Sequence, residues 1–350
     1  MNMNEDKLHE FLGKAVGDLG AAISASLMLI GDRLGLYKAL AQGPATSAEL
    51  AQRAGANERY VREWLGNQAA GGYVQYDAAN DRYSLSEEQR LCLADPNGPV
   101  DIPGAYFFVE AMFHDLDRTE ENFRTGKGME WGEHHPCLFH GTERFFRAGY
   151  NANLLASWLP ALDGTVDKLK RGGKAADVGC GHGASTVLMA QAFPDSEFIG
   201  YDYHPGSIEV ARERAAAAGV ENARFEVADA TGYVDRDFDL IAFFDCLHDM
   251  ADPVGAARHA RKAVSDDGAC MIVEPFAGDR VADNLNPVGR VYYGASAQIC
   301  VPVSLARKGP ALGAQAGEAR LRKVVVDGAG FSHFRRATET PFNIVLEARP

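Results

Sequence analysis

The sequence contains no apolar run long enough to cross a membrane. Its longest weakly polar stretch, Leu19–Ile30, has about a dozen residues interrupted by Ala, Ser and Gly, whereas a transmembrane helix needs about 20. Glu5, Asp6 and Lys14 stand where a signal peptide would carry a basic patch and an unbroken apolar stretch. We therefore expect a cytoplasmic protein that does not have a membrane as a partner.

Cysteine is scarce, and the spacing of the six thiols excludes two kinds of site. The cysteines are Cys92, Cys137, Cys180, Cys246, Cys270 and Cys300. They form no C-x-x-C pair, as is typical of reduced thiols in a reducing compartment. This pattern predicts neither a disulfide framework nor a structural zinc site.

One short segment, residues 134–140, is rich in possible metal ligands. It contains His134, His135, Cys137 and His140. This spacing matches no standard zinc finger. We expect no metal in the protein and interpret the segment as a loop or lid that faces the substrate.

Positive charge is also in deficit, because 35 Lys and Arg stand against 48 Asp and Glu and leave a formal net charge of −13. An acidic surface of this size repels polyanions, so nucleic acid is not an expected partner. Hydrophobic residues at 46% and charged residues at 24% are ordinary for a soluble globular protein. A length of 350 residues favours two domains.

The first 95 residues predict a mostly helical domain that ends in a hairpin. Apolar residues recur every three or four positions from residue 5 to 40, which predicts long helical structure with one apolar stripe, up to Gly43-Pro44. A capping box at Thr46–Glu49 begins a second helix, and a third begins near Asn57. Residues 73–86 then predict a β-hairpin. This order of elements is that of a winged helix.

The charge of this winged helix favours dimerisation over DNA binding. Residues 1–95 contain nine Lys and Arg against thirteen Asp and Glu. The predicted recognition helix balances its two arginines with Glu58 and Glu63. Phosphate contacts supply most non-specific DNA affinity, and this domain lacks the positive charge for them. We therefore expect the domain to form a homodimer through the apolar stripe of residues 5–40. DNA binding is the alternative.

The rest of the chain predicts a helical connection followed by an α/β domain. Residues 96–165 are helical in pattern and are expected to form a substrate lid. Strands are expected within residues 166–350, at 175–178, 197–201, 224–227, 239–244 and 269–273. Their alternation with helices predicts a Rossmann-like, doubly wound, mostly parallel sheet.

A glycine-rich loop follows the first of these strands. It reads Asp177-Val-Gly-Cys-Gly-His-Gly183, so Gly179, Gly181 and Gly183 alternate with other residues just before a predicted helix. Glycines at such a turn let the backbone approach a ligand closely. The loop also fits a dinucleotide-binding fingerprint, and alone it does not identify the ligand.

Acidic residues at the ends of the following strands indicate which ligand the glycine-rich loop binds. Asp202 ends the second strand, where an acid accepts hydrogen bonds from ribose hydroxyls. Asp229 ends the third strand, in a position to accept from an adenine amino group, and Asp245 follows the fourth. A site lined with carboxylates suits a ligand with a sulfonium and an ammonium and no pyrophosphate. The pattern therefore favours S-adenosylmethionine over a nicotinamide.

With these motifs the chain resembles the class I S-adenosylmethionine-dependent methyltransferases, in particular small-molecule O-methyltransferases with an N-terminal winged-helix dimerisation domain. It is also similar to a bacterial branch often labelled as transcriptional regulators. Residues 47–55 and 60–65 match the family's winged helix. Phe145–Tyr150 matches the segment that closes over cofactor and substrate, and the resemblance covers nearly the whole chain.

The resemblance implies a catalytic set. His248 falls on the position of the general base, although Met250 stands where the family usually has Trp. Glu274 falls on the first acid that orients this base, and Glu318 falls on the second. An imidazole with a pKa of about 6.5 is sufficiently unprotonated at pH 7 to accept a proton. The alternatives are a core histidine at 248 and solvated acids at 274 and 318.

Together, the motifs and the resemblance predict a methyltransferase that uses S-adenosylmethionine and releases S-adenosylhomocysteine. The cofactor residues are expected to be Asp177, Gly179, Gly181, Gly183, Asp202, Tyr203, Asp229, Ala230, Asp245 and Tyr150. The expected acceptor is a hydroxyl of a small molecule. The alternatives are S- or N-methylation without a base, and a ligand-sensing winged-helix regulator.

Overall fold

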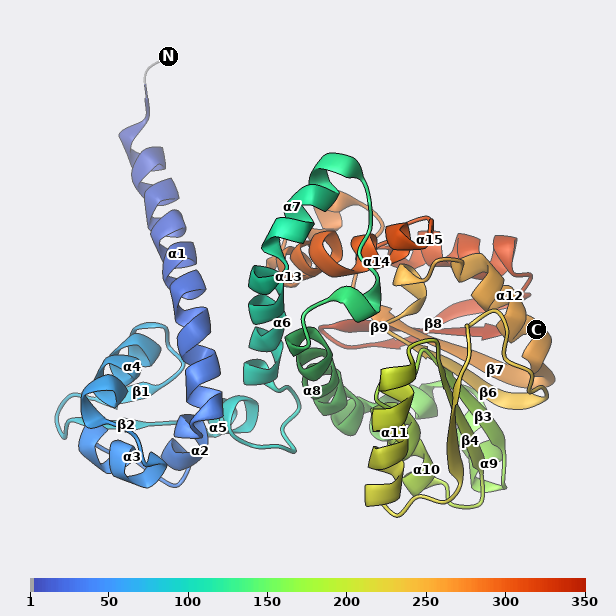
Figure 1. The fold of residues 1–350 in the computed structure, drawn as a ribbon, viewed down its shortest axis with the longest axis horizontal. Helices are drawn as coiled ribbons and strands as arrows, with labels where there is room; N and C mark the ends of the chain where they lie inside the picture. The colour runs from blue at the N-terminus through green and yellow to red at the C-terminus, as the bar shows by residue number, and fades with distance from the viewer. Residues whose placement is uncertain (1–2) are drawn as a thin grey trace. The chain divides into compact units, whose positions relative to one another are not determined.

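The computed structural model describes residues 3–350, which form two compact units (Figure 1). The first unit contains the described residues up to Phe113 together with Pro136–Gly149. The second contains His114–His135 and Tyr150–Pro350. The segment 96–165, expected to be a separate connection, is therefore divided between the two units.

The first unit is a set of helices with one small antiparallel hairpin. Its elements are α1 (Glu5–Arg33), α2 (Leu36–Leu40), α3 (Ser47–Ala54), α4 (Glu58–Ala70), β1 (Gln75–Asp77), β2 (Arg82–Ser84), α5 (Glu87–Leu93) and most of α6 (Ile102–His114) and α8 (Cys137–Asn153). The predicted capping box is present, because Thr46 and Glu49 each accept from the other's backbone amide. The winged-helix order expected from the sequence is confirmed.

Helix α1 keeps most of its apolar stripe exposed. Leu12, Val16, Leu19 and Ile23 are 48–68% exposed, and Figure 1 shows the N-terminal part of α1 extending beyond the other helices of its unit. The helix has 29 residues and, by length and composition alone, is long and apolar enough to cross a membrane, which differs from the expectation that no run is long enough. Core helices of soluble proteins and N-terminal signal sequences share this length and composition.

The second unit is built on a seven-stranded sheet. Its strands are β3 (Lys174–Val178), β4 (Glu197–Asp202), β5 (Ala223–Val227), β6 (Phe238–Phe244), β7 (Val264–Pro275), β8 (His333–Glu339) and β9 (Asn343–Arg349). Its α-helices are α7 (Leu116–Thr125), α9 (Thr165–Lys170), α10 (Ala184–Ala192), α11 (Pro205–Ala217), α12 (Pro253–Ala263), α13 (Pro287–Ala295), α14 (Val301–Ala306) and α15 (Gly317–Arg322). Short 3-10 or π turns are η1 (Trp131–Glu133), η2 (Leu154–Trp158), η3 (Leu159–Ala161), η4 (Leu247–Asp249), η5 (Val281–Asn284), η6 (Ser296–Cys300) and η7 (Lys323–Gly328).

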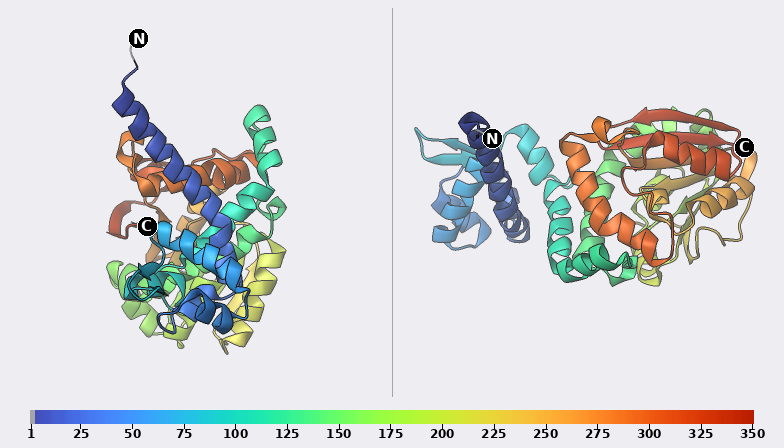
Figure 2. Two further views of the ribbon diagram at one scale, coloured as in Figure 1. Left: turned by 90° about the vertical axis from the view of Figure 1, so that its left-hand side faces the viewer. Right: turned by 90° about the horizontal axis from the view of Figure 1, so that it is seen from above.

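The strand order is β5-β4-β3-β6-β7-β9-β8, and the first five strands are parallel. Strand β9 pairs antiparallel with both β7 and β8, so the sheet is mostly parallel with an antiparallel margin (Figure 2, right, in red). The chain order reverses between β3 and β6. In doubly wound sheets this is the point at which ligands bind, beyond the carboxyl ends of the strands.

Helices cover both faces of the sheet and bury it. Helix α12 and the turn η7 pack on one face through residues such as Ala260 and Val325, against Ile241 and Ile272. Helices α10 and α11 pack on the other face, in a cluster that includes Phe225. The core thus lies in two layers around the strands, which leaves their carboxyl ends and the following loops to form a site.

Candidate active site

The glycine loop after β3 has the conformation that the sequence predicts. Gly179, Gly181 and Gly183 have φ values of 79°, 50° and 72°, in the left-handed region that favours glycine. A Cβ at Gly183 would lie 2.7 Å from the Phe225 ring, so the start of α10 approaches β5 too closely for any side chain. The amide of Gly181 donates to Asp202 Oδ2 at 3.0 Å. The loop is thereby fixed to the end of β4.

Asp177 is buried at the end of β3 with one oxygen engaged and one free. Its Oδ2 accepts hydrogen bonds of 2.6 Å from the hydroxyls of Ser185 and Thr186 at the start of α10. Its Oδ1 is buried and, among the described residues, has no hydrogen-bond partner. Burial raises the pKa of Asp177 to about 6, although the two hydroxyls act in the opposite direction. An unpaired buried acceptor of this kind fits a cationic ligand group.

Asp202 and Asp229 lie at the carboxyl ends of the neighbouring strands β4 and β5. Asp202 Oδ1 accepts from the amide of His204 at 2.8 Å, and burial raises its pKa. Asp229 Oδ1 accepts from the hydroxyl of Thr231 at 2.7 Å, while its Oδ2 pairs with Arg307 Nη2 at 2.9 Å. Both predicted acids therefore lie on the expected edge of the sheet, and Asp229 has a cationic partner that the sequence did not indicate.

The remaining predicted cofactor residues also belong to this edge. Tyr203 directly follows Asp202 and is half-buried, Ala230 packs at the margin of the sheet core, and Tyr150 is buried against Phe244 with ring centroids 5.2 Å apart. Burial raises the pKa of Tyr150. The negative charges of Asp245 and Asp177 raise it further.

Asp245 follows β6 in a strained conformation, with φ at 51°. Its Oδ1 accepts from Asn343 Nδ2 at 2.8 Å, and its buried Oδ2 has no partner among the described residues. Burial and the neighbouring Glu274 carboxylate raise the pKa of Asp245, against the effect of His248. Asn343 is a site residue that sequence reasoning missed. It comes from β9, and no local motif marks it.

His248 and Glu274 form a buried pair. His248 Nδ1 lies 2.5 Å from Glu274 Oε2, and the two residues are 3% and 1% exposed. Burial alone would lower the pKa of His248, but the Glu274 carboxylate and the Cys300 thiol raise it well above its ordinary value. The pair thus favours the imidazolium form of His248 more than an isolated histidine does.

The structure does not bring Glu318 to this pair. Glu318, on α15, accepts from Arg336 Nε at 2.9 Å and is about one-third exposed. Arg336 belongs to β8 and also pairs with Glu339. The predicted second orienting acid is thus held by an arginine from a strand that the sequence did not reveal, and of the two predicted acids Glu274 is the one that contacts His248.

The segment that contains His134 is held by a carboxylate. His134 is 5% exposed, and its Nδ1 lies 3.0 Å from Asp115 Oδ2. Residue His135 stacks on His114 with ring centroids 3.9 Å apart. Within residues 3–350 no group of three or more His, Cys, Asp or Glu side chains is arranged to hold a metal ion.

The chemistry of this edge is that of a cation site with a proton-holding group. The buried atoms Asp177 Oδ1, Asp245 Oδ2 and Glu274 Oε1 lack hydrogen-bond partners among the described residues. These carboxylates fit the sulfonium and ammonium groups of S-adenosylmethionine. The glycine loop lets the backbone approach such a ligand closely.

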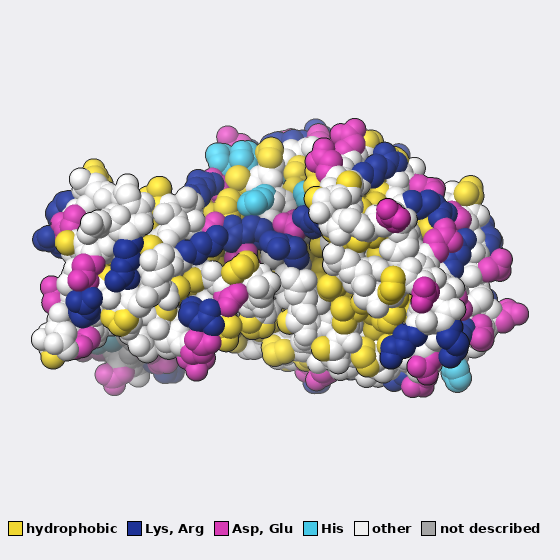
Figure 3. All heavy atoms as spheres, turned by 90° about the horizontal axis from the view of Figure 1, so that it is seen from below, with side chains coloured by type: hydrophobic (Ala, Val, Ile, Leu, Met, Phe, Trp, Pro, Cys, Tyr) yellow, Lys and Arg dark blue, Asp and Glu magenta, His cyan; other side chains and the backbone are white. Residues whose placement is uncertain are grey.

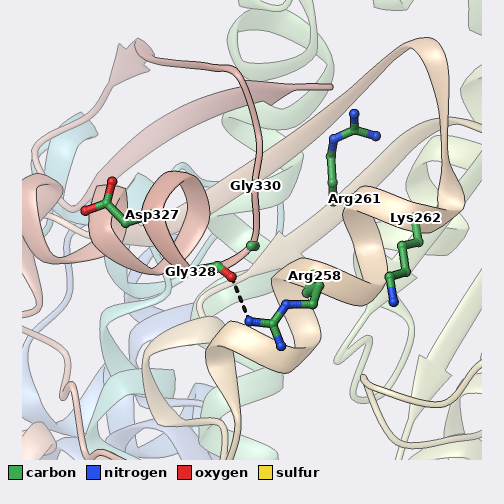
Figure 4. A pocket seen from close by; sticks show the side chains of 7 residues that line it. Arg258, Arg261, Lys262, Asp327, Gly328 and Gly330 are labelled. Carbon is green, nitrogen blue, oxygen red and sulfur yellow. Dashed lines mark hydrogen bonds between the residues drawn. The ribbon is translucent and has the colours of Figure 1, made fainter.

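A separate hollow of about 460 Å³ lies between α12 and η7. It is lined by Arg258, Arg261, Lys262, Asp327 and residues 328–330. Figure 4 shows that the three cationic side chains point in different directions, and that Arg258 donates to the Gly328 carbonyl, at 2.8 Å. The end of α12 leads into the start of β7, so this hollow faces the edge opposite to His248 and is not part of the site.

Family models match both parts of the chain. Residues 169–301 match a model described as a methyltransferase domain. Residues 21–95 match a model described as an Rv2258c-like winged HTH domain. These matches confirm the two domain types predicted from the sequence.

Similar proteins support the same fold. Human N-acetylserotonin methyltransferase, in complex with S-adenosylmethionine, is 16% identical with a TM-score of 0.71, covering 100% of this chain and 99% of that chain. An O-methyltransferase family protein from Burkholderia thailandensis is 18% identical with a TM-score of 0.62, covering 100% and 98%.

A curated relative matches about a third of the chain. The tRNA (guanine-N(7)-)-methyltransferase of Cutibacterium acnes is 30% identical over 131 residues, which is 37% of this chain and 43% of that protein. The chain spans about half the length, or less, of the first curated relatives it matches. The chain therefore contains a winged HTH domain and a methyltransferase domain. Its fold, with the glycine loop and the acidic edge of the sheet, is that of the class I S-adenosylmethionine-dependent methyltransferases.

Proposed function

We propose that the protein transfers a methyl group from S-adenosylmethionine to a hydroxyl of a small-molecule acceptor. The observation that carries the proposal is the buried His248–Glu274 pair, which lies with the acidic residues Asp177 and Asp245 beside the glycine loop. S-adenosylmethionine supplies a methyl group on a sulfonium sulfur, which is open to in-line attack by a nucleophile. The chain then has to hold donor and acceptor in line and accept the acceptor's proton.

Each residue has a stated task in this proposal. The glycine loop and Asp202 position the adenosine part, and the unpaired oxygen of Asp177 attracts the ammonium group. Glu274 fixes the ring orientation and tautomer of His248 through Nδ1, which leaves Nε2 for the acceptor proton. Because Glu274 raises the pKa of His248, the ring is a stronger base for that proton than an isolated imidazole.

Calorimetry with S-adenosylmethionine and S-adenosylhomocysteine tests the donor. We expect binding in the micromolar range, weakened by Asp202→Asn and unchanged by Asp163→Asn, which alters an exposed acid on the surface. No binding at high micromolar concentration would refute the proposal.

A panel of phenols, alcohols, thiols and amines, scored by release of S-adenosylhomocysteine, tests the acceptor. We expect turnover of hydroxyl compounds by the wild type. In His248→Gln this turnover should be lost while donor binding persists. Turnover confined to thiols or amines and indifferent to His248 would instead favour the alternative without a base.

We further propose that the protein is a homodimer formed through α1. The exposed stripe of Leu12, Val16, Leu19 and Ile23 follows a spacing of three and four residues along one helix face. An apolar surface of this length is typical of an interface. Light scattering of the wild type should give twice the mass of one chain. The double variant Val16→Glu, Ile23→Glu should give the mass of a single chain. A wild-type monomer, or partition of the wild type into lipid vesicles, would contradict the dimer.

The arrangement of charges on α4 does not favour a DNA-binding role. Arg59 and Arg62 pair with Glu63 and Glu58, respectively, within the same helix. On the face drawn in Figure 3, acidic and basic side chains are interspersed over the winged-helix end. Within residues 3–350 the six cysteines form no disulfide, which fits a reducing compartment such as the cytoplasm.

A further inference from the structure

The guanidinium of Arg307 contacts two residues expected at the cofactor site, Tyr203 and the predicted adenine contact Asp229. Its Nη2 lies 2.9 Å from Asp229 Oδ2, and its central carbon lies over the ring of Tyr203 at 4.9 Å from the centroid. Tyr203 and Asp229 follow the neighbouring strands β4 and β5. A planar cation that stacks on an aromatic ring and donates to a carboxylate reproduces the two interactions that adenine makes through its face and its amino group.

The backbone around Arg307 is held firmly, so the side chain is the part that can move. Arg307 follows α14, where Lys308 has φ at 62° and the amide of Gly309 donates to the Ser304 carbonyl at 2.8 Å. A Cβ at Gly309 would lie 2.9 Å from backbone atoms of Ala251. The chain after α14 therefore has little room to shift.

A second carboxylate lies near the guanidinium. The amide of Met129 donates to the Pro302 carbonyl at 3.0 Å, which fixes the loop before η1 against α14. Glu130 is the next residue, and its charge, together with that of Asp229, raises the pKa of Arg307. The guanidinium thus has two carboxylates available, one at the end of β5 and one on the loop.

We propose that Arg307 occupies the adenine subsite and acts as its gate, a proposal that rests on the proposed use of S-adenosylmethionine. The base takes its place on Tyr203 and Asp229 only when the guanidinium leaves them, and Glu130 receives the displaced cation. Arg307 therefore lowers affinity for every adenosine ligand and favours the release of S-adenosylhomocysteine. The residue is a positioning residue of the cofactor site and takes no part in methyl transfer.

Calorimetry on the full chain tests the gate with two probes, S-adenosylhomocysteine and 5′-methylthioadenosine, which lacks the amino-acid part. Arg307→Met should tighten the binding of both probes by the same factor, about three- to tenfold. This is the range that an exposed ion pair and a cation–π contact together supply. Glu130→Gln should weaken the binding of both probes by about two- to threefold, because the displaced guanidinium loses its second partner.

Control variants separate the gate from general effects. Arg280→Met removes another exposed arginine that pairs with an acid, Asp283, and should leave both affinities unchanged. Arg307→Lys keeps the positive charge but lacks the planar guanidinium, so its affinity for both probes should lie between those of the wild type and Arg307→Met. This variant tests the gate even if Arg307→Met folds poorly. Unchanged or weaker binding in Arg307→Met, with the wild type binding normally, would overturn the gate. Failure of both wild type and variant to bind would refute the proposed function itself.

Discussion

His248 Nδ1 and Glu274 Oε2 lie 2.5 Å apart in a region where both residues are almost fully buried. Two opposite charges in such surroundings stabilise each other only as a pair, because either one alone is poorly solvated. Glu274 Oε1 has no partner among the described residues, so His248 is the main counter-charge of this carboxylate. The titration of the imidazole is therefore governed by Glu274.

Replacing the carboxylate should lower the pKa of His248. In Glu274→Gln the neighbouring charge is lost while burial still disfavours the imidazolium, so we expect the pKa to fall from well above 6.5 to below it. Nuclear magnetic resonance titration of ¹⁵N-labelled imidazole measures this directly. His259, whose ring nitrogen bonds to the Tyr233 carbonyl, serves as the internal control and should not shift. A His248 pKa that stays high in the variant would show that Glu274 is not the cause.

The same pair should make stability depend on pH. The folded-state pKa of His248 is raised, so its contribution is fully present below about pH 6.5 and is lost as pH rises through the folded-state value. We compare the wild type with the double variant His248→Gln, Glu274→Gln by urea unfolding. The advantage of the wild type should shrink above pH 6.5 by up to about 1.4 kcal/mol per pH unit. An advantage that grows with pH would have the wrong sign and contradict the assignment.

Binding of S-adenosylhomocysteine should release a proton near pH 6. Burial raises the pKa of Asp177 to about 6, so the carboxyl is about half protonated there. The ligand's ammonium group favours the ionised form, and affinity should therefore rise between pH 5 and 7. Calorimetry in two buffers of different ionisation enthalpy counts the protons.

Two variants identify the source of that proton. Asp177→Asn should abolish the release, whereas Asp249→Asn, which removes another acid whose pKa burial raises, to about 7, should leave most of it. Proton uptake on binding by the wild type would contradict the prediction.

The parts of the site that are local in sequence were predictable. The loop from Asp177 to Gly183 carries its conformation in its glycines, and the acids at 202, 229 and 245 follow strands that are visible as short apolar runs. Parallel strands place their carboxyl ends on one edge, so residues far apart in sequence meet without any further information.

The parts that depend on long-range pairing were not predictable. Strand β8 has a mostly exposed, polar pattern, and only its pairing with β9 makes it a strand. Because β8 was not predicted, its residue Arg336 was not considered as a partner of Glu318. The ion pair with Arg336 is what holds Glu318 away from His248. Asn343 and Arg307 reach Asp245 and Asp229 across 98 and 78 residues, respectively, and neither belongs to a local motif.

Two glycines of the loop provide a matched pair for the last prediction. Gly181 and Gly183 both have positive φ, so alanine at either position is strained by about 1–2 kcal/mol. A Cβ at Gly181 would meet no atom within 4 Å, whereas at Gly183 it would lie 2.7 Å from Phe225 and 2.9 Å from Ala211. Urea unfolding should therefore show a larger loss for Gly183→Ala, by a further 1–3 kcal/mol or so.

Ligand binding should rank the two variants in the opposite way when it is measured on folded protein. The added methyl at Gly181 points into open space, beside the amide that donates to Asp202 Oδ2 in the proposed cofactor site. It should weaken S-adenosylhomocysteine binding although it costs little stability. The methyl at Gly183 points toward the packed interface of α10, α11 and β5, so its folded fraction should bind nearly as the wild type does. Equal stability losses, or normal binding by Gly181→Ala, would contradict this division between the two faces of the loop.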